Sequence, residues 1–419
     1  MITSQGEIPL DWKTTALEND LRVITIKRKG TGTVAVRFYV RAGSRFDGGQ
    51  LGKAHFLEHM LFKGTTTRSP KQIYAAIEAH GGDINAVTTR EYSSLRTVTL
   101  PSDLPLALDL LADVLINPLL EETSFQKEKL IVLNEILSAN DQMGILGDLF
   151  IQTLWKRNQL RNPILGTVEC LRDLELKDVS SLYTERYVTG NTILVICGDI
   201  HHDDALATVQ RNLSDFQPGP EQPPTPISEP SLEKCRESHI EKDIHRTYVM
   251  IGVPTVGMKH PDRSAIKVIE LALGMGGSGR LFQRLREDAQ IVYSVNTFSA
   301  IYEDVGFLGI RAACAPENLD AVRSAVLVEW NAIKEEGLAE DEIQATKGHY
   351  AGRTARHFET NGAVAGIVGI EGLLHEVETF QEAIARIGSV TTKQVIEAAR
   401  RYLDHERYAV AIVGRKADS

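Results

Sequence analysis

The sequence predicts an α+β protein with two homologous, α/β-sandwich-like domains, each a mostly antiparallel sheet with helices packed on it. Three observations support this prediction. The chain has 419 residues, which is long enough for two domains. Both halves open with runs rich in β-branched and aromatic residues and then pass into helical patterns. A proline-rich stretch separates the two halves.

The first half carries the clearest signals for individual elements. Its strand-like runs are residues 21–26, 34–40, 84–88 and 93–100, and we expect the last two to pair antiparallel. Ser69 followed by Pro70 is a typical helix start, and Gly81-Gly82 is a typical stop, which predicts a helix over 71–80. Helical patterns then dominate from residue 105 to about residue 155.

The second half repeats this order. It opens with a strand-like run at 247–253. Each half closes with an amphipathic helix ending in Arg-Tyr (Arg186-Tyr187 and Arg401-Tyr402), followed by an apolar strand that ends in glycine. The matching context of the two Arg-Tyr pairs predicts an internal duplication.

The boundary between the halves is the stretch 217–230, which contains six of the 15 prolines. Because proline fixes φ and removes a hydrogen-bond donor, we expect an extended, semi-rigid linker there. The predicted organisation is a domain at 1–216, a linker at 217–230 and a second domain at 231–419.

The composition excludes several classes of protein. With 46 basic and 56 acidic side chains the net charge is −10, which argues against nucleic acid as a partner. No apolar run approaches the ~18 residues that cross a bilayer, so no membrane association is expected. The four scattered cysteines predict reduced thiols, and the amino terminus resembles neither a secretory signal nor a transit peptide. We expect a cytoplasmic protein, with an organelle matrix as the alternative.

The motif His55-Phe-Leu-Glu58-His59 is the central candidate for chemistry. On a helix, His55 and His59 lie one turn apart on the same face, where both imidazoles can bind one Zn²⁺, and Glu58 lies beside them. The neighbouring residues are almost all apolar, so the helix is expected to be buried, where two histidines and a glutamate are costly without a purpose. A hydrogen-bonding cluster without metal is the alternative.

A catalytic zinc site usually takes a third protein ligand. The helical stretch 124–138 offers Glu128 and Glu135, which lie seven residues apart and therefore on one face. Glu135 stands among apolar residues, which predicts a buried side chain, although a solvated glutamate is the alternative.

The second half contains the glycine-rich run 274–282, followed by Arg286 and Tyr293. A glycine-rich run before a helix is compatible with phosphate binding. The run lacks a Walker lysine and a preceding Rossmann strand, however, so a nucleotide site is not favoured. Taken alone, Arg286 and Tyr293 would be an ordinary surface pair.

These motifs resemble the pitrilysin/insulinase zinc metallopeptidases, the inverzincins, and most closely their mitochondrial-processing-peptidase-like branch. The resemblance rests on the run from His55 to Thr65 with Glu128 and Glu135, on Gly43-Ser-Arg45 and the 81–86 segment, and on the linker position. It covers nearly the whole chain.

The resemblance implies a role for each candidate residue. It implies that His55, His59 and Glu135 bind one zinc ion per chain, with Glu58 as general base and Glu128 supporting the ligands. Arg286 and Tyr293 would bind substrate and stabilise the developing oxyanion. The 84–87 segment, with Asn85 and Ala86, would align an extended peptide, and the loop with Gly276 and Gly277 would lie near the peptide path.

The implied activity is a zinc-dependent endopeptidase that hydrolyses unfolded peptides or oligopeptides inside a closed chamber. Relatives of this length pair two chains, so we expect a homodimer in which Arg286 and Tyr293 act across the interface. Two alternatives stay open. The chain could be the catalytic subunit of a heterodimeric processing peptidase, or a non-catalytic structural or presenting homologue.

Overall fold

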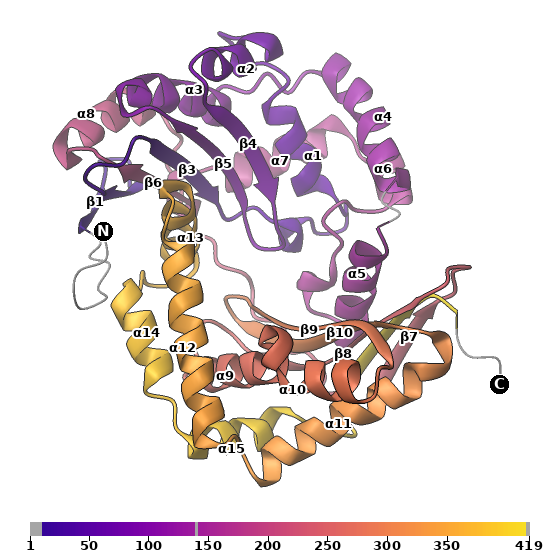
Figure 1. Ribbon diagram of the computed structural model, residues 1–419. Helices are drawn as coiled ribbons and strands as arrows, with labels where there is room; N and C mark the ends of the chain where they lie inside the picture. Colours follow the sequence, from indigo (N-terminus) through magenta and orange to yellow (C-terminus); the bar gives the residue numbers. More distant parts are fainter. Residues whose placement is uncertain (1–10, 139–140, 416–419) are drawn as a thin grey trace. The chain divides into compact units, whose positions relative to one another are not determined.

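Figure 1 shows the computed structural model of the chain, which describes residues 11–138 and 141–415. As far as the structure describes them, the residues form two compact units. Unit 1 comprises Met1–Ser138, Asn162–Thr225 and Ala355–Phe380. Unit 2 comprises Ala139–Arg161, Pro226–Thr354 and Gln381–Ser419.

Unit 1 is built on a six-stranded sheet with the order β1-β2-β6-β3-β5-β4. Its strands are β1 (Asp11–Ala16), β2 (Arg22–Lys27), β3 (Val34–Val40), β4 (Asp83–Thr88), β5 (Ser93–Thr99) and β6 (Thr192–Gly198). Its helices are α1 (Lys53–Leu61), α2 (Pro70–Glu78), α3 (Leu104–Ile116), α4 (Glu122–Ser138), α6 (Val168–Asp173), α7 (Leu176–Arg186), α8 (His202–Leu213) and α13 (Asn361–Leu374).

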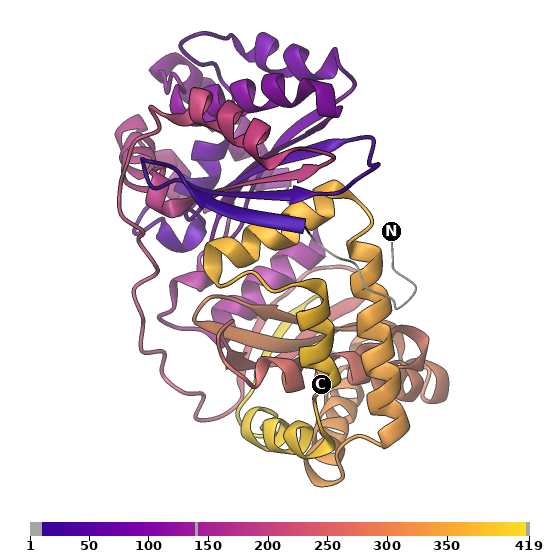
Figure 2. The same cartoon turned by 90° about the vertical axis from the view of Figure 1, so that its left-hand side faces the viewer.

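Alternation along β3 divides the helices of unit 1 between the two faces of its sheet. Val36 and Phe38 are buried in the core that α1, α3 and α8 cover. Tyr39 points to the opposite face, where its hydroxyl donates to the Gly366 carbonyl of α13 at 3.1 Å. Figures 1 and 2 show α13 running along this sheet.

Unit 2 is built on a five-stranded sheet with the order β7-β11-β8-β10-β9. Its strands are β7 (Arg236–Ile240), β8 (Thr247–Val256), β9 (Val292–Ile301), β10 (Val305–Cys314) and β11 (Ala409–Val413). Its helices are α5 (Gln142–Leu154), α9 (Arg263–Gly274), α10 (Arg280–Phe282), α11 (Leu319–Glu335) and α15 (Thr392–Tyr402); α12 (Glu340–His357) and α14 (Phe380–Gly388) each cross the division between the units.

The same alternation organises unit 2. Val249 and Ile251 of β8 are buried in the core with α9, α11 and α15, whereas Met250 belongs to a separate cluster with Phe150 of α5. The prediction of two mostly antiparallel sheets with helices packed on them is therefore confirmed.

The two sheets share one connectivity. When β1 is set aside, each sheet places its first, fifth, second, fourth and third strand side by side in that order. In both sheets the first and fifth strands pair in parallel, and the remaining neighbours pair antiparallel. This match supports the duplication that the sequence predicts.

One helix of each half belongs to the other unit. α5 precedes the linker in the sequence but packs on β8 and β11 of unit 2. α13 lies in the second half of the chain but packs on β3 and β6 of unit 1. When β1 is set aside, each of these helices is the third α-helix after the fourth strand of its half. The two halves therefore exchange equivalent helices.

Several smaller expectations can be compared with the structure. Helix α2 begins after Ser69 with Pro70 in its first turn, as predicted, and a capping box closes that end. Residues 217–232 form neither helix nor strand. All four cysteines are free thiols. Within the described residues, no helix has the length and apolar character needed to cross a membrane.

Candidate metal centre

Helix α1 is fixed at its start by a buried carboxylate. Asp47 accepts the main-chain N–H groups of Gly52 at 2.7 Å and of Ala54 at 2.8 Å, which satisfies donors that have no partner within the helix. Burial raises the pKa of Asp47 to about 7, although these two N–H groups oppose the shift. Gly52 has φ +87°, so the turn into the helix favours glycine.

Two histidines of α1 and one glutamate of α4 converge. The Nε2 atom of His55 lies 3.7 Å from one oxygen of Glu135, and Nε2 of His59 lies 3.7 Å from the other. The centroids of the two imidazole rings are 4.6 Å apart. One ligand atom from each of the three side chains lies within 4.8 Å of the others. The structure thus brings together the predicted ligand trio.

The burial of these three side chains differs from the prediction for one of them. His55 is buried, and burial, helped by the charge of His59, lowers its pKa to about 4. Glu135 is 41% exposed, so the prediction that it is buried is wrong. Apolar neighbours do not mark a buried face here, because Leu137 also points to solvent and Val132 alone among them is buried.

Glu128 lies behind His59 and is almost fully buried. Its Oε1 is 2.7 Å from Nδ1 of His59, and its Oε2 is 2.6 Å from Nζ of Lys63. Burial alone would raise the pKa of Glu128, but the hydrogen bonds from His59 and Lys63 lower it. Because Nδ1 of His59 is engaged by Glu128, Nε2 is left to face Glu135.

Glu58 lies between the two histidines in the sequence, and its carboxylate accepts a hydrogen bond from the sheet. The hydroxyl of Thr88, the last residue of β4, donates to its Oε2 at 2.6 Å. Burial raises the pKa of Glu58, while Thr88 and His59 oppose the shift and Glu135 adds to it. A carboxylate with a raised pKa is a stronger base than an ordinary glutamate, which suits it to accepting a proton.

The donor set fits a zinc ion. Two imidazoles and a carboxylate are common zinc ligands, and ligands about 2.0–2.2 Å from one tetrahedral ion lie roughly 3.4 Å from each other. The observed 3.7 Å between each Nε2 atom and Glu135 is close to this spacing and too long for a hydrogen bond. His55 is neutral at pH 7, because its pKa is about 4, so its nitrogen lone pair is available to a metal.

Arg286 and Tyr293 belong to unit 2 and lie near each other. The guanidinium carbon of Arg286 is 5.8 Å from the centre of the Tyr293 ring, and that of Arg246 is 3.6 Å from it. Tyr293, in the edge strand β9, is 58% exposed. The helix expected after the glycine run covers residues 280–288: α10 continues directly into a π-helical segment, Gln283–Asp288, which carries Arg286.

The proposed substrate residues lie on exposed backbone. Asn85 and Ala86 are in β4, which forms one edge of the unit 1 sheet and pairs with β5. Asn85 points outward and Ala86 inward. Gly276 and Gly277 lie in a 3₁₀ turn of unit 2, and Gly276 has φ +56°. Unpaired main-chain groups of an edge strand are able to bind an extended peptide.

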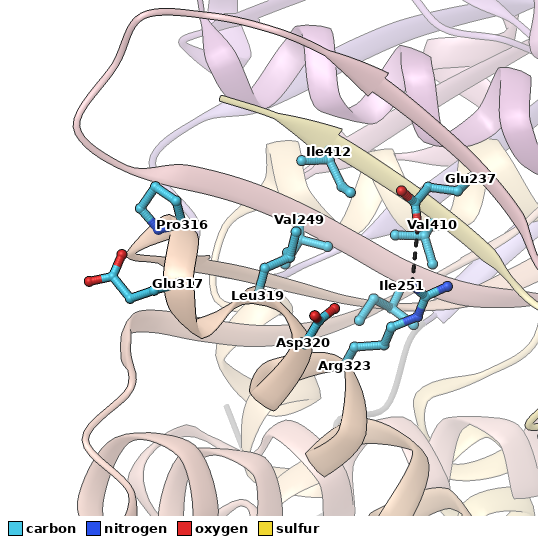
Figure 3. Close-up of a pocket in the computed structure, with 10 residues that line it drawn as sticks. All are labelled: Glu237, Val249, Ile251, Pro316, Glu317, Leu319, Asp320, Arg323, Val410 and Ile412. Atoms are coloured by element: carbon cyan, nitrogen blue, oxygen red, sulfur yellow. Dashed lines mark hydrogen bonds and ion pairs between the residues drawn. The ribbon is translucent and has the colours of Figure 1, made fainter. Parts of the chain in front are cut away.

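A pocket of about 250 Å³ lies in unit 2, and none of the predicted site residues lines it. Its lining combines apolar side chains of β8 and β11 with charged ones: Glu237, Val249, Ile251, Pro316, Glu317, Leu319, Asp320, Arg323, Val410 and Ile412. Figure 3 shows the Arg323 guanidinium directed at Glu237, at 3.1 Å. The positive charge of the pocket is thus already paired.

The sequence analysis missed three residues that support the site: Asp47, Lys63 and Thr88. Lys63 lies one turn after His59, a spacing that could have suggested a shared partner. Thr88 lies two residues after Ala86, and alternation along a strand places both on the inward face. No pattern in the sequence relates Asp47 to the start of α1.

Two sequence profiles of one family match the chain. The profile of insulinase (peptidase family M16) matches residues 22–168, which include all four residues of the site on α1 and α4 together with Glu128. The profile of the peptidase M16 inactive domain matches residues 173–349.

The chain is also similar to individual proteins along nearly its whole length. It is 32% identical over 405 residues to an uncharacterized zinc protease of Mycobacterium leprae, covering 96% of this chain and 91% of the relative. It is 27% identical over 418 residues to the beta subunit of the mitochondrial-processing peptidase of Bos taurus, covering 96% and 84%. A protease from Helicobacter pylori has the same fold, with a TM-score of 0.91 at 21% identity over 97% of this chain and all of that one.

Proposed function

Because the chain belongs to the insulinase family of peptidases, family M16, we propose that it is a zinc-dependent endopeptidase acting on unfolded peptides. The observation that carries this proposal is the convergence of His55, His59 and Glu135, with Glu58 beside them. Two imidazoles and a carboxylate suit a zinc ion, and a further carboxylate beside them can serve as a base, which together support this proposal.

In the proposed reaction the side chains of the site hold the metal ion, orient its ligands and transfer a proton. His55, His59 and Glu135 would hold the zinc ion, which supplies Lewis-acid polarisation of the scissile carbonyl and of water. Glu58 accepts a proton from the attacking water and delivers it to the leaving amine. Glu128 keeps His59 in the orientation that presents Nε2.

The peptide would bind along the edge strand β4. Main-chain groups near Asn85 and Ala86 would add the substrate as a further strand, which recognises backbone more than sequence. Such binding favours extended, unfolded segments, because a folded substrate has no free strand to offer. Gly276 and Gly277 would leave room for the peptide.

We propose further that two copies of the chain enclose the reaction chamber. In this arrangement Arg286 and Tyr293 of one copy act on a peptide held by the metal centre of the other, where Tyr293 donates to the developing oxyanion. The test mixes a Glu58→Gln chain with a Tyr293→Phe chain under conditions in which subunits exchange. Activity should return in the mixture, because one of the two composite sites is then intact. A mixture no more active than its components would contradict the contribution of Tyr293 across the interface.

A heterodimer is the second candidate, favoured by the likeness to a subunit of the mitochondrial-processing peptidase. The purified chain separates the two cases, because a homodimer cleaves peptides by itself and a heterodimer subunit does not. A non-catalytic role is disfavoured, because the match to the inactive-domain profile begins at residue 173, after all the ligands.

The central experiment measures zinc and cleavage together. We expect about one zinc ion per chain and cleavage of an unfolded peptide that a chelator abolishes and added zinc restores. Glu58→Gln should keep the metal and lose cleavage by a factor of about 10²–10⁴, because it removes the base and spares the ligands. A zinc-loaded Glu58→Gln protein with full turnover would exclude Glu58 from this role.

A further inference from the structure

The carboxylate of Glu58 is held from the sheet by a buried hydroxyl. Thr88 donates to Oε2 of Glu58 at 2.6 Å, and its side chain is only 7% exposed. Within the described part of the chain, no other side chain donates a hydrogen bond to this carboxylate. The main-chain N–H of Thr88 also donates to this carboxylate, so Thr88 supplies both contacts from the sheet.

A second buried hydroxyl packs against that of Thr88. Thr88 and Ser93 face each other in the β4–β5 pair, and their side-chain oxygens are 3.2 Å apart. The Ser93 hydroxyl donates to the carbonyl of Ala42, just after β3, at 2.9 Å. Each hydroxyl has one hydrogen, and those of Thr88 and Ser93 go to Glu58 and to Ala42, so the contact between the two hydroxyl oxygens is one of packing.

We propose that Thr88, held in β4, is a positioning residue that sets the side-chain conformation of Glu58. This inference rests on the proposed function, in which Glu58 is the general base. A glutamate has three rotatable side-chain bonds. Without the hydrogen bond from the Thr88 hydroxyl, the Glu58 carboxylate would spend part of its time turned away from the reacting water. Because a hydroxyl can donate and accept, the contact can persist when the carboxyl group takes up a proton.

The decisive variants are Thr88→Val, which keeps the shape and removes the hydroxyl, and Thr88→Ser, which keeps the hydroxyl. We expect Thr88→Val to lower kcat by a factor of about 10–100 with little change in KM or zinc affinity, since a misplaced catalytic group costs rate rather than binding. Thr88→Ser should stay within about threefold of the wild type.

Thr97→Val is the matched control. Thr97 is a buried threonine of the same strand pair, and its hydroxyl donates to the carbonyl of Asp83 at 2.7 Å instead of to Glu58. It should lower thermal stability but not kcat. A Thr88→Val protein with wild-type kcat overturns the proposal. So does an equal loss of kcat in Thr88→Ser or in Thr97→Val, since the hydroxyl contact to Glu58 would then not be the cause.

A crystal structure of the Thr88→Val protein tests the positioning independently of activity. One ordered conformation of Glu58 in the wild type and several in the variant support the proposal, even if the wild type cleaves no peptide. In that case the proposed function fails while the role of Thr88 stands. A single, unchanged conformation of Glu58 in both proteins overturns it.

Discussion

At the scale of single residues, Glu128 shows how a buried charge can serve a neighbouring ligand. Its two oxygens bind His59 and Lys63, so the negative charge is fully paired despite its burial. Its partner His59 gains a raised pKa, because the hydrogen bond and charge of Glu128 outweigh burial. The same bond fixes which ring nitrogen of His59 faces Glu135.

Glu128→Gln should weaken zinc binding by a factor of about 10–100, because an amide holds the imidazole less firmly than a carboxylate and makes it less basic. Competition with a chromophoric chelator measures the affinity. Glu122→Gln, an exposed position on the same helix, serves as the control and should bind zinc like the wild type. Equal affinities of all three proteins would leave Glu128 with no role at the metal.

A second residue, Asp113 of α3, fixes the loop between α1 and α2. It accepts hydrogen bonds from Thr65 at 2.6 Å, Thr67 at 2.8 Å and Arg68 at 2.6 Å. Burial would raise the pKa of Asp113, but these donors outweigh it and lower the pKa below its ordinary value of 3.8. The folded protein then binds fewer protons than the unfolded chain at acid pH.

Asp113 should therefore stabilise the fold above about pH 4 and lose this contribution as the pH falls through its lowered pKa. Asp113→Asn should lower the free energy of unfolding at pH 7 by about 1–3 kcal/mol. Below pH 4 that free energy should fall less steeply with pH in the variant than in the wild type. Urea unfolding at several pH values measures both. Asp109→Asn removes a half-exposed partner of the same arginine and should cost less than about 1 kcal/mol. Equal losses in the two variants would refute the argument.

At the scale of elements, the packing of α13 depends on glycine. A Cβ atom on Gly369 would lie 2.1 Å from an atom of the Tyr39 ring, far inside van der Waals contact. The helix can therefore approach β3 only without a side chain at this position. The carbonyls of Gly372 and Leu373, at the end of α13, accept hydrogen bonds from Arg22 and Arg41.

Gly369→Ala should lower the free energy of unfolding by about 1–3 kcal/mol, because overpacking outweighs the roughly 1 kcal/mol that alanine gains over glycine in a helix. Gly362→Ala is the control on the same helix. Its added Cβ would meet nothing closer than 3.7 Å, so the change should be neutral or slightly stabilising. Thermal unfolding followed by circular dichroism distinguishes the two. A Gly369→Ala protein as stable as the wild type would show that α13 can move away from the sheet.

The local patterns of the sequence predicted much of the fold and of the metal trio. The Ser69-Pro70 start of α2, the β-branched and aromatic residues of β3 and the one-turn spacing of His55 and His59 are each visible within a few residues of sequence. Glu135 was predicted as a ligand but not as a half-exposed one, because exposure depends on what packs above the helix. Thr88 was missed because its partner Glu58 lies 30 residues away.

At the scale of the whole molecule, the exchange of α5 and α13 also escaped prediction. Both helices are apolar enough to cover a sheet, and nothing in their sequences says which of two similar sheets they cover. The exchange has a consequence for folding, because neither half of the sequence contains all of one compact unit. A fragment ending at Thr225 lacks α13, and a fragment beginning at Pro226 lacks α5.

The two fragments 1–225 and 226–419 should therefore fail to fold separately and assemble when they are expressed together. The first leaves Tyr39 and its face of the sheet uncovered, and the second uncovers Met250 and Phe307. Alone, each should bind a hydrophobic dye and unfold without cooperativity, whereas the pair should elute as a 1:1 complex with a cooperative transition. Joining residues 355–380 to fragment 1–225 through a flexible linker should restore its cooperative unfolding, because α13 then covers the sheet again. Either fragment melting cooperatively by itself, without the added helix, would show that the exchanged helices are dispensable for folding.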